Sequence, residues 1–222
     1  MKLLALETAN EQCSVCIVDE KQTLFFERDM RAKAQTQTIL PMIEQGLNST
    51  QLETSGLTAI AFSRGPGSFS GVRINAAVTQ ALAWSNDLPV VPVSTLQALA
   101  QAAYREVGLA QVTAVLDARM HEVYMASFQL DENQIMQALD EEKLLSYDAA
   151  AEYQKFTLIG SGSALIHADA VQYQQISATA EDIATIARQN VAKQEWVSAE
   201  LALPVYLRDN AWKKIPEQGK AI

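Results

Sequence analysis

The sequence predicts an α/β fold with two lobes, and three observations support this prediction. Short apolar runs alternate with amphipathic helical patterns through the first half of the chain. A second series of strand-like runs begins after Gly108. The chain has 222 residues, of which 49% are hydrophobic, and this is enough for one large domain or two small ones. We therefore expect an N-terminal lobe over 1–108 and a C-terminal lobe over 109–222, whose tail could pack back on the N-terminal lobe.

The N-terminal half shows the order β-β-β-α-β-α-β-α. Three strands with short polar links predict an antiparallel meander. Pro41 should kink the first helix or lie in its first turn. Ser94 and Gln97 form a capping box for the third helix, which Gly108 ends. The predicted strands span 2–7, 13–19, 23–29, 56–63 and 89–93, and the helices span 35–47, 71–86 and 94–107.

The C-terminal half begins with two predicted strands joined by the tight connection 118–121. Residues 131–134 are polar and predict a turn before a third strand. A glycine pair, Gly160 and Gly162, comes after the last strand and could form either an anion loop or a bend. The predicted strands span 112–117, 122–130, 135–139 and 156–159, and a helix is predicted over 181–193.

Composition and the rare residue types disfavour several classes of function. The net charge of −9 disfavours autonomous binding to nucleic acid, because phosphates repel an acidic chain. Cys13 and Cys16 fall on a strand and point to opposite faces, so we expect structural thiols rather than a redox pair. His121 and His167 are far apart in sequence, and we expect no metal site. No apolar run is long enough for a signal peptide or a membrane helix, so we expect a soluble, cytoplasmic protein.

The segment 63–74, SRGPGSFSGVRI, joins a predicted strand to a predicted helix. Pro66 and Gly67 favour a type II turn, and amides at a helix start could bind an anion. The segment matches neither common phosphate-loop pattern, so a tight strand–helix connection is an equally good interpretation. We expect the loop to be architectural and interfacial, with both arginines directed toward an anionic group or a partner carboxylate. Its residues are Arg64, Gly65, Gly67, Ser68, Gly71 and Arg73.

Five segments occur in order along nearly the whole chain: KLLALETA from Lys2, RGPGSFSGVRI from Arg64, PVVPVSTL from Pro89, LDARMHEVY from Leu116 and PVYLR from Pro204. With these motifs the sequence resembles the TsaB family, also called YeaZ. The resemblance implies the ASKHA fold of actin and sugar kinases, with two ribonuclease-H-like lobes that contain mixed sheets. It also implies a non-catalytic scaffold and activator in the synthesis of N6-threonylcarbamoyladenosine at position 37 of tRNAs that read ANN codons.

The resemblance further implies partners. TsaD would form a heterodimer with the chain, and the ATPase TsaE would work with that pair. The same surface would form a homodimer when the chain is alone, and tRNA would be contacted only through the complex. The resemblance implies no cofactor of the chain's own, although ATP or ADP could lie at the partner interface.

The chain departs from the family at four positions: Asp, Gly, Gly and His are usual where it has Glu7, Asn75, His121 and Gln35. Its first hairpin, with Glu7 and Thr8, has no glycine and resembles a degenerate phosphate hairpin. A kinase-like nucleotide-binding enzyme of the same fold is therefore the alternative function. A glycoprotease-type peptidase is a weaker one, because the sequence has no metal motif and no nucleophile elbow. A simple homodimeric scaffold is the third.

The helix predicted over 71–86 suggests a surface for a partner. On a helical projection Ile74, Val78, Ala81 and Leu82 lie on one side, which we expect to face the sheet. The opposite side carries small residues at the spacing of a helix–helix seam, and the preceding helix would add Met42. The predicted seam consists of Val72, Ala76, Thr79 and Ala83.

The tail carries the one cationic segment. It could contact RNA within a complex, but we favour a tail that packs Tyr206 and Trp212 on the body. The cationic residues are Arg208, Lys213, Lys214 and Lys220.

Overall fold

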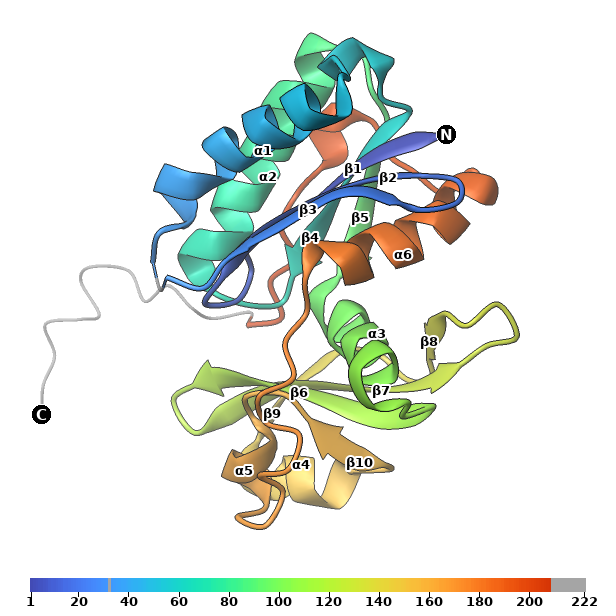
Figure 1. Ribbon diagram of the computed structural model, residues 1–222. Coiled ribbons are helices and arrows are strands. Elements are labelled where there is room, and N and C mark those ends of the chain that lie inside the picture. The colour runs from blue at the N-terminus through green and yellow to red at the C-terminus, as the bar shows by residue number, and fades with distance from the viewer. Residues whose placement is uncertain (32, 209–222) are drawn as a thin grey trace, which may run out of the picture.

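The computed structural model describes residues 1–31 and 33–208, and its helices and sheets form alternating layers (Figure 1). The N-terminal sheet contains five strands in the order β3-β2-β1-β4-β5. β1 pairs antiparallel with β2 and parallel with β4, so the sheet is mixed. The strands are β1 (Lys2–Glu7), β2 (Cys13–Asp19), β3 (Thr23–Asp29), β4 (Ala59–Gly65) and β5 (Val90–Ser94).

The C-terminal sheet repeats the mixed pairing with shorter strands. Its order is β10-β6-β7-β8, and β9 also pairs with β7. β6 pairs antiparallel with β7 and parallel with β10. Two mixed sheets with helices on their faces confirm the predicted α/β class. The strands are β6 (Gln111–Arg119), β7 (Glu122–Leu130), β8 (Met136–Ala138), β9 (Lys143–Ser146) and β10 (Thr157–Ile159).

Within the described residues, six α-helices cover the two sheets. α1 (Gln35–Thr50) and α2 (Phe69–Ser85) lie on the outer face of the N-terminal sheet. α3 (Thr95–Val107) and α6 (Ala180–Ala192) lie between the sheets. α4 (Tyr147–Tyr153) and α5 (Ser163–Ile166) cover the outer face of the C-terminal sheet. None of the described helices combines the length and apolar character that crossing a membrane requires.

The predicted boundary at residue 108 separates the two sheets but not the helices that cover them. α3 belongs to the first half of the chain, yet it packs mainly on β6, β7 and β8. α6 belongs to the second half, yet it packs on β1, β2, β4 and β5. The two helices therefore exchange lobes, and one buried cluster runs through both sheets and the helices between them. A division at 108 therefore does not describe α6, which packs on the N-terminal sheet.

The segment after α6 also returns to the N-terminal lobe. Val197 forms an antiparallel bridge with Val90 of β5. The short 3-10 helix Ala199–Leu201 packs against α2, and Ala199 and Ala202 are buried in the N-terminal core.

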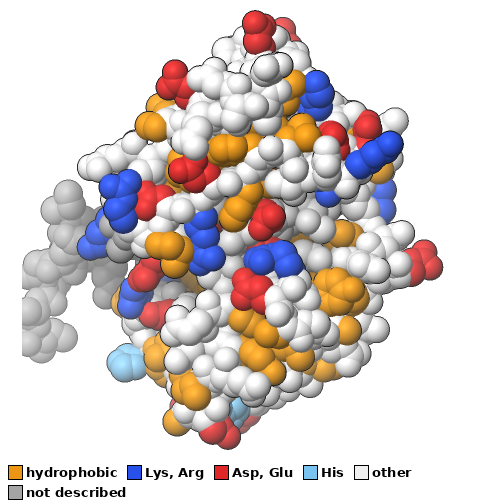
Figure 2. Space-filling view, in the orientation of Figure 1, with side chains coloured by type: hydrophobic (Ala, Val, Ile, Leu, Met, Phe, Trp, Pro, Cys, Tyr) orange, Lys and Arg blue, Asp and Glu red, His pale blue; other side chains and the backbone are white. Residues whose placement is uncertain are grey.

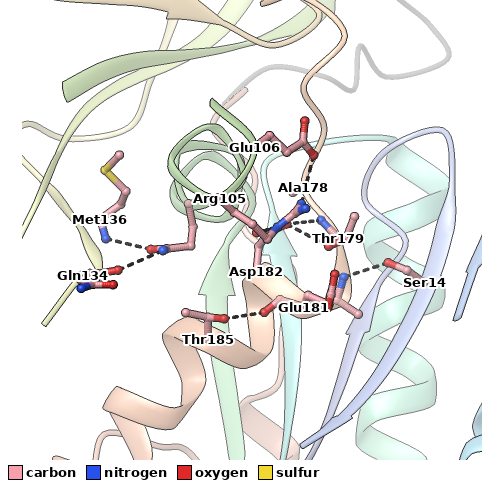
Figure 3. A network of polar contacts seen from close by, with 12 residues as sticks. Ser14, Arg105, Glu106, Gln134, Met136, Ala178, Thr179, Glu181, Asp182 and Thr185 are labelled. Atoms are coloured by element: carbon pink, nitrogen blue, oxygen red, sulfur yellow. Dashed lines mark hydrogen bonds and ion pairs between the residues drawn. The ribbon is translucent and has the colours of Figure 1, made fainter. Parts of the chain in front are cut away.

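The exchanged helices are fastened to each other by a polar network (Figure 3). Arg105 of α3 donates a 2.9 Å hydrogen bond to the Asp182 carboxylate of α6, which is almost fully buried. Asp182 also accepts from the N–H and the hydroxyl of Thr179, both at 2.9 Å, and so completes a capping box. The network stabilises the start of α6 and joins it to α3, because one carboxylate serves both purposes.

Several predicted boundaries shift for local reasons. β4 starts at Ala59 rather than at residue 56, because Thr54–Gly56 form a 3-10 turn. Ser94 caps α3 through the N–H of Gln97 at 3.2 Å, and Gly108 ends the helix with a φ of 71°. Only half of the predicted capping box forms, because the Gln97 side chain donates to the Met136 carbonyl instead. Pro41 lies inside α1, beyond its first turn.

Candidate partner-binding surface and glycine loop

The glycine loop joins β4 to α2 as predicted, but by a different turn. The peptide bond between Gly65 and Pro66 is cis, and the left-handed residue is Gly65, with a φ of 104°. Gly67 has no positive φ, so the predicted type II turn is wrong. Ser68 caps α2 by accepting a 3.4 Å hydrogen bond from the N–H of Gly71.

The loop packs directly on the connection after β1. The N–H of Ser68 donates to the Ala9 carbonyl at 2.7 Å, and the Thr8 hydroxyl donates to the Gly71 carbonyl at 2.7 Å. A Cβ atom on Gly67 or on Gly71 would overlap with the backbone oxygen of Ala9 or Thr8, respectively. The loop and the degenerate phosphate hairpin therefore fill the space between them with their own backbones.

Glu7 and Asn75 are both fully buried beneath this loop. Burial raises the pKa of the Glu7 carboxyl to about 7, and hydrogen bonding to Ser63 and to the N–H of Ala9 offsets only part of that effect. The Asn75 amide donates to the Leu6 carbonyl at 3.1 Å and to the Ser63 hydroxyl at 2.7 Å. Asn75 therefore ties α2 to β1 and β4, a role that the glycine usual in the family could not fill.

The two loop arginines are engaged within the chain itself. Arg64 forms an ion pair with Glu142 of the C-terminal lobe at 3.3 Å. Arg73 donates to the Phe69 carbonyl at 2.8 Å and lies over the Phe69 ring at 3.4 Å and the Tyr206 ring at 4.8 Å. Arg64 therefore points to an anionic group as expected, although this carboxylate belongs to its own chain, whereas Arg73 contacts a carbonyl and two aromatic rings.

The predicted partner seam faces inward, so this expectation is also wrong. All its α2 residues and Met42 of α1 are at most 5% exposed. Small side chains let α2 approach its own sheet and α1 closely, and this contact produces the seam-like spacing. The buried residues are Val72, Ala76, Thr79, Ala83 and Met42.

The side of α2 that was expected to face the sheet is only partly buried, and its residues Ile74, Val78 and Leu82 are half-buried against the core. Ala77 and Ala81 are exposed, and Trp84 is 68% exposed. Leu40 on neighbouring α1 is 55% exposed. Glu44 and Arg73 are the only charged residues in the two helices. The surface over α1, at the upper left of Figure 2, accordingly shows few charged side chains.

The remaining predicted residues have structural surroundings. Cys13 and Cys16 are buried free thiols, and burial raises their pKa values to about 11 and about 12. The His121 ring lies edge-on to Tyr147 at 5.7 Å. No group of three or more potential metal ligands occurs among the described residues. Trp212, Lys213, Lys214 and Lys220 lie outside the described residues.

Sequence reasoning expected the C-terminal segment to pack on the body of the protein, but it did not identify the residues that this segment contacts. Val205 donates its N–H to the Arg64 carbonyl at 2.8 Å, and Arg208 pairs with Glu122. The motif PVYLR was a signal for these contacts, but its sequence does not say which parts of the chain it touches.

Known proteins are similar to this chain over nearly its full length. A family model described as "TsaD: tRNA N6-adenosine threonylcarbamoyltransferase" matches residues 29–215. The tRNA threonylcarbamoyladenosine biosynthesis protein TsaB of Escherichia coli K12 is 38% identical, with 97% of this chain and 99% of that protein covered. TsaB of Haemophilus influenzae Rd is 33% identical, with 97% and 98% covered.

A solved structure gives the same result for the fold. YeaZ from Pseudomonas aeruginosa is 36% identical, with a TM-score of 0.85 over 93% of this chain and 99% of that one. This likeness and the matching family model agree with the predicted ASKHA fold of two ribonuclease-H-like lobes. The chain therefore belongs to the TsaB family.

Proposed function

We propose that the chain is a non-catalytic subunit of the complex that makes N6-threonylcarbamoyladenosine at position 37 of tRNAs that read ANN codons. TsaD is its heterodimer partner and carries out the transfer, and TsaE works with the pair. The names of the full-length relatives support the pathway.

The packing of the glycine loop on Thr8 and Ala9 carries the non-catalytic part of the proposal. Sugar kinases of this fold hold nucleotide phosphates with such hairpins, and phosphoryl transfer depends on positioning and charge neutralisation. Here the Ser68 N–H donates a hydrogen bond to the Ala9 carbonyl, and Arg64 forms an ion pair with Glu142. The chain brings a phosphate-binding fold to the complex without a free phosphate site at this position.

The exposed side of α1 and α2 is the surface we assign to TsaD. A solvent-facing helix pair usually carries lysine and glutamate, whereas this one carries only Glu44 and Arg73. Ala77 and Ala81 allow a second helix to approach closely, and Leu40 and Trp84 provide large apolar contacts on either side. When the chain is alone, a second copy occupies the same surface, so the homodimer and the heterodimer compete.

Nucleotide and RNA enter only with the partner. ATP or ADP binds at the interface with TsaD. The net charge of −9 keeps the isolated chain from binding tRNA at physiological salt. The complex works in the cytoplasm.

The test is reconstitution from purified components. We expect the chain to co-purify with TsaD and the pair, supplied with TsaE and threonylcarbamoyl-adenylate, to modify tRNA, while omission of the chain abolishes product. The chain alone should not hydrolyse ATP above a no-protein control. Measurable turnover by the isolated chain would support the kinase-like alternative, and full activity without the chain would refute the proposal.

A further inference from the structure

Residues 204–208, the clasp segment, run along the junction of the two lobes. The first part of the clasp segment rests on the N-terminal lobe. Val205 donates its N–H to the Arg64 carbonyl at 2.8 Å. The Val205 carbonyl lies over Gly65, where an added Cβ atom would be 3.1 Å away from it. Tyr206 lies beside the Arg73 guanidinium of α2.

The last residue of the clasp segment reaches the C-terminal lobe. Arg208 forms an ion pair with Glu122 at the start of β7 and donates to the Ala118 carbonyl of β6 at 3.1 Å. The two side chains of the pair are 22% and 31% exposed. Arg208 therefore contacts both ends of the β6–β7 turn, and Val205, only three residues earlier, is hydrogen-bonded to the end of β4.

A second ion pair crosses the junction beside the first. Arg64, whose carbonyl holds Val205, reaches across to Glu142 at 3.3 Å. Glu142 precedes β9, which pairs with β7. The two crossings are therefore linked at both ends, through the backbone of Arg64 in one lobe and through β7 in the other. Partly buried pairs that share a framework hold a geometry better than isolated surface pairs do.

The clasp segment is separate from the helices that also join the lobes. α3 and α6 form the packed layer between the sheets, with Arg105 and Asp182 as their polar link. In Figure 1 the described end of the chain, in red, lies to the left of that layer. The lobes are thus joined by an apolar layer on one side and by a polar attachment on the other.

We propose that residues 204–208 act as an interlobe clasp, which fixes the angle between the two sheets by holding the end of β4 to the β6–β7 turn. When the clasp opens, the lobes move about the α3–α6 layer, which stays packed. This proposal concerns the free chain and does not depend on its partners.

Distances between two spin labels, one in each lobe, test this motion. Ser55→Cys in the N-terminal lobe and Glu152→Cys in the C-terminal lobe replace exposed residues. The native thiols are buried and have raised pKa values, so they should not be labelled. With the labelled chain diluted into unlabelled protein, we expect a single narrow distance distribution. Arg208→Ala and Glu122→Gln should each broaden it toward longer distances.

Hydrogen exchange provides a second readout at the clasp itself. The Val205 amide should exchange roughly tenfold faster or more in both variants, because its acceptor on Arg64 is then held by fewer contacts. Arg31→Ala is the matched control: it removes an arginine pair with Asp29 that lies within one lobe. That variant should leave the distance distribution and the Val205 exchange unchanged.

Glu122→Gln keeps the shape of the side chain, so it still tests the clasp if the Arg208→Ala variant fails to fold. An unchanged distance distribution in folded Glu122→Gln protein overturns the clasp. So does a broadening that Arg31→Ala reproduces to the same extent.

Discussion

Each lobe places a left-handed glycine at the same point of the same strand pattern. In both sheets the first strand pairs antiparallel with the second and parallel with a later one. Gly65 ends the later strand β4 with a φ of 104°, and Gly160 comes directly after the later strand β10 with a φ of 90°. A helix starts within four residues of each glycine. The sequence shows no strong internal repeat, so the two lobes share a backbone arrangement that is not evident from their side chains.

The lobes differ in the helix that comes after this glycine. In the N-terminal lobe it is α2, with 17 residues and an accessible face almost free of charge. In the C-terminal lobe it is α5, with only 4 residues. The same backbone arrangement therefore occurs in both lobes. Only in the N-terminal lobe is the helix after the glycine long enough to form the surface proposed for the partner.

The largest expected effect is on stability, and it should differ between substitutions at Gly160 and at Gly65. Gly160→Ala should lower the free energy of unfolding by roughly 3 kcal/mol or more, because the new Cβ would lie 2.5 Å from Leu99 and 2.6 Å from the Val115 carbonyl at a left-handed φ. Gly65→Ala should cost only about 1–2 kcal/mol, since its nearest neighbour is the Val205 carbonyl at 3.1 Å. Urea unfolding measures both. Equal losses would mean that the two positions are equally constrained, contrary to this comparison.

The second prediction concerns the faces of α2. Ala81→Arg should leave the monomer folded and weaken binding to TsaD by roughly a hundredfold or more, because a charge enters the proposed contact. Ala76→Glu should instead destabilise the monomer itself, because Ala76 is buried. Calorimetric binding and thermal unfolding separate the two effects.

Ala138→Arg is the matched control for that experiment, since Ala138 is exposed in the C-terminal sheet. It should bind TsaD as the unmodified chain does. Normal binding by Ala81→Arg, or a loss of binding equal to that of Ala138→Arg, would remove α2 from the interface.

The third prediction concerns the buried carboxyl beneath the N-terminal glycine loop. The pKa of Glu7 is about 7 in the folded chain and near 4.5 when unfolded. Between these values the folded state holds a proton that the unfolded state has lost, so stability falls as the pH rises from 4.5 to 7 and stays low above it. Glu7→Gln removes this loss and should gain on the order of 3 kcal/mol relative to the parent between about pH 4.5 and pH 8. A pH-independent difference in urea unfolding would contradict it.

The smallest effect is expected for the Arg64–Glu142 pair between the lobes. Its side chains are 30% and 14% exposed, so Arg64→Ala should cost about 1 kcal/mol of stability. Glu142→Gln should cost a similar amount, and the double variant should cost less than the sum. Additive losses in this double-mutant cycle would show that the two side chains do not interact in solution.

Local signals predicted most of the elements correctly. Apolar runs identified the strands of the N-terminal sheet, and Ser94 and Gly108 marked the ends of α3 where the structure has them. Such signals work because a strand or a cap depends on a few neighbouring residues. The same reasoning identified the glycine loop as a connection, but the position of its left-handed residue depends on how Val205 and Ala9 pack against it.

Signals that depend on distant parts of the chain were misread. Both sides of α2 are apolar, so the hydrophobic pattern has no clear direction, and the smaller side was taken for a helix–helix seam. In the structure the small residues of α2 face the sheet, and Trp84 is exposed to solvent. The crossing of α3 and α6 between the lobes could not be predicted either. An apolar helix face shows that a helix packs on a sheet, but it does not show which of the two sheets that is.

The crossing of α3 and α6 has a consequence for how the protein is made on the ribosome. When residue 108 has been synthesised, the N-terminal sheet still lacks α6, and the apolar stripe of α3 still lacks β6 to β8. The inner face of that sheet, with Leu3, Ala5, Ala61 and Val91, is fully covered only after residue 192 has emerged, because α3 contacts mainly β4 and β5 among its strands. Neither lobe can therefore finish folding during its own synthesis, and the two should form together in a single step near the end of translation.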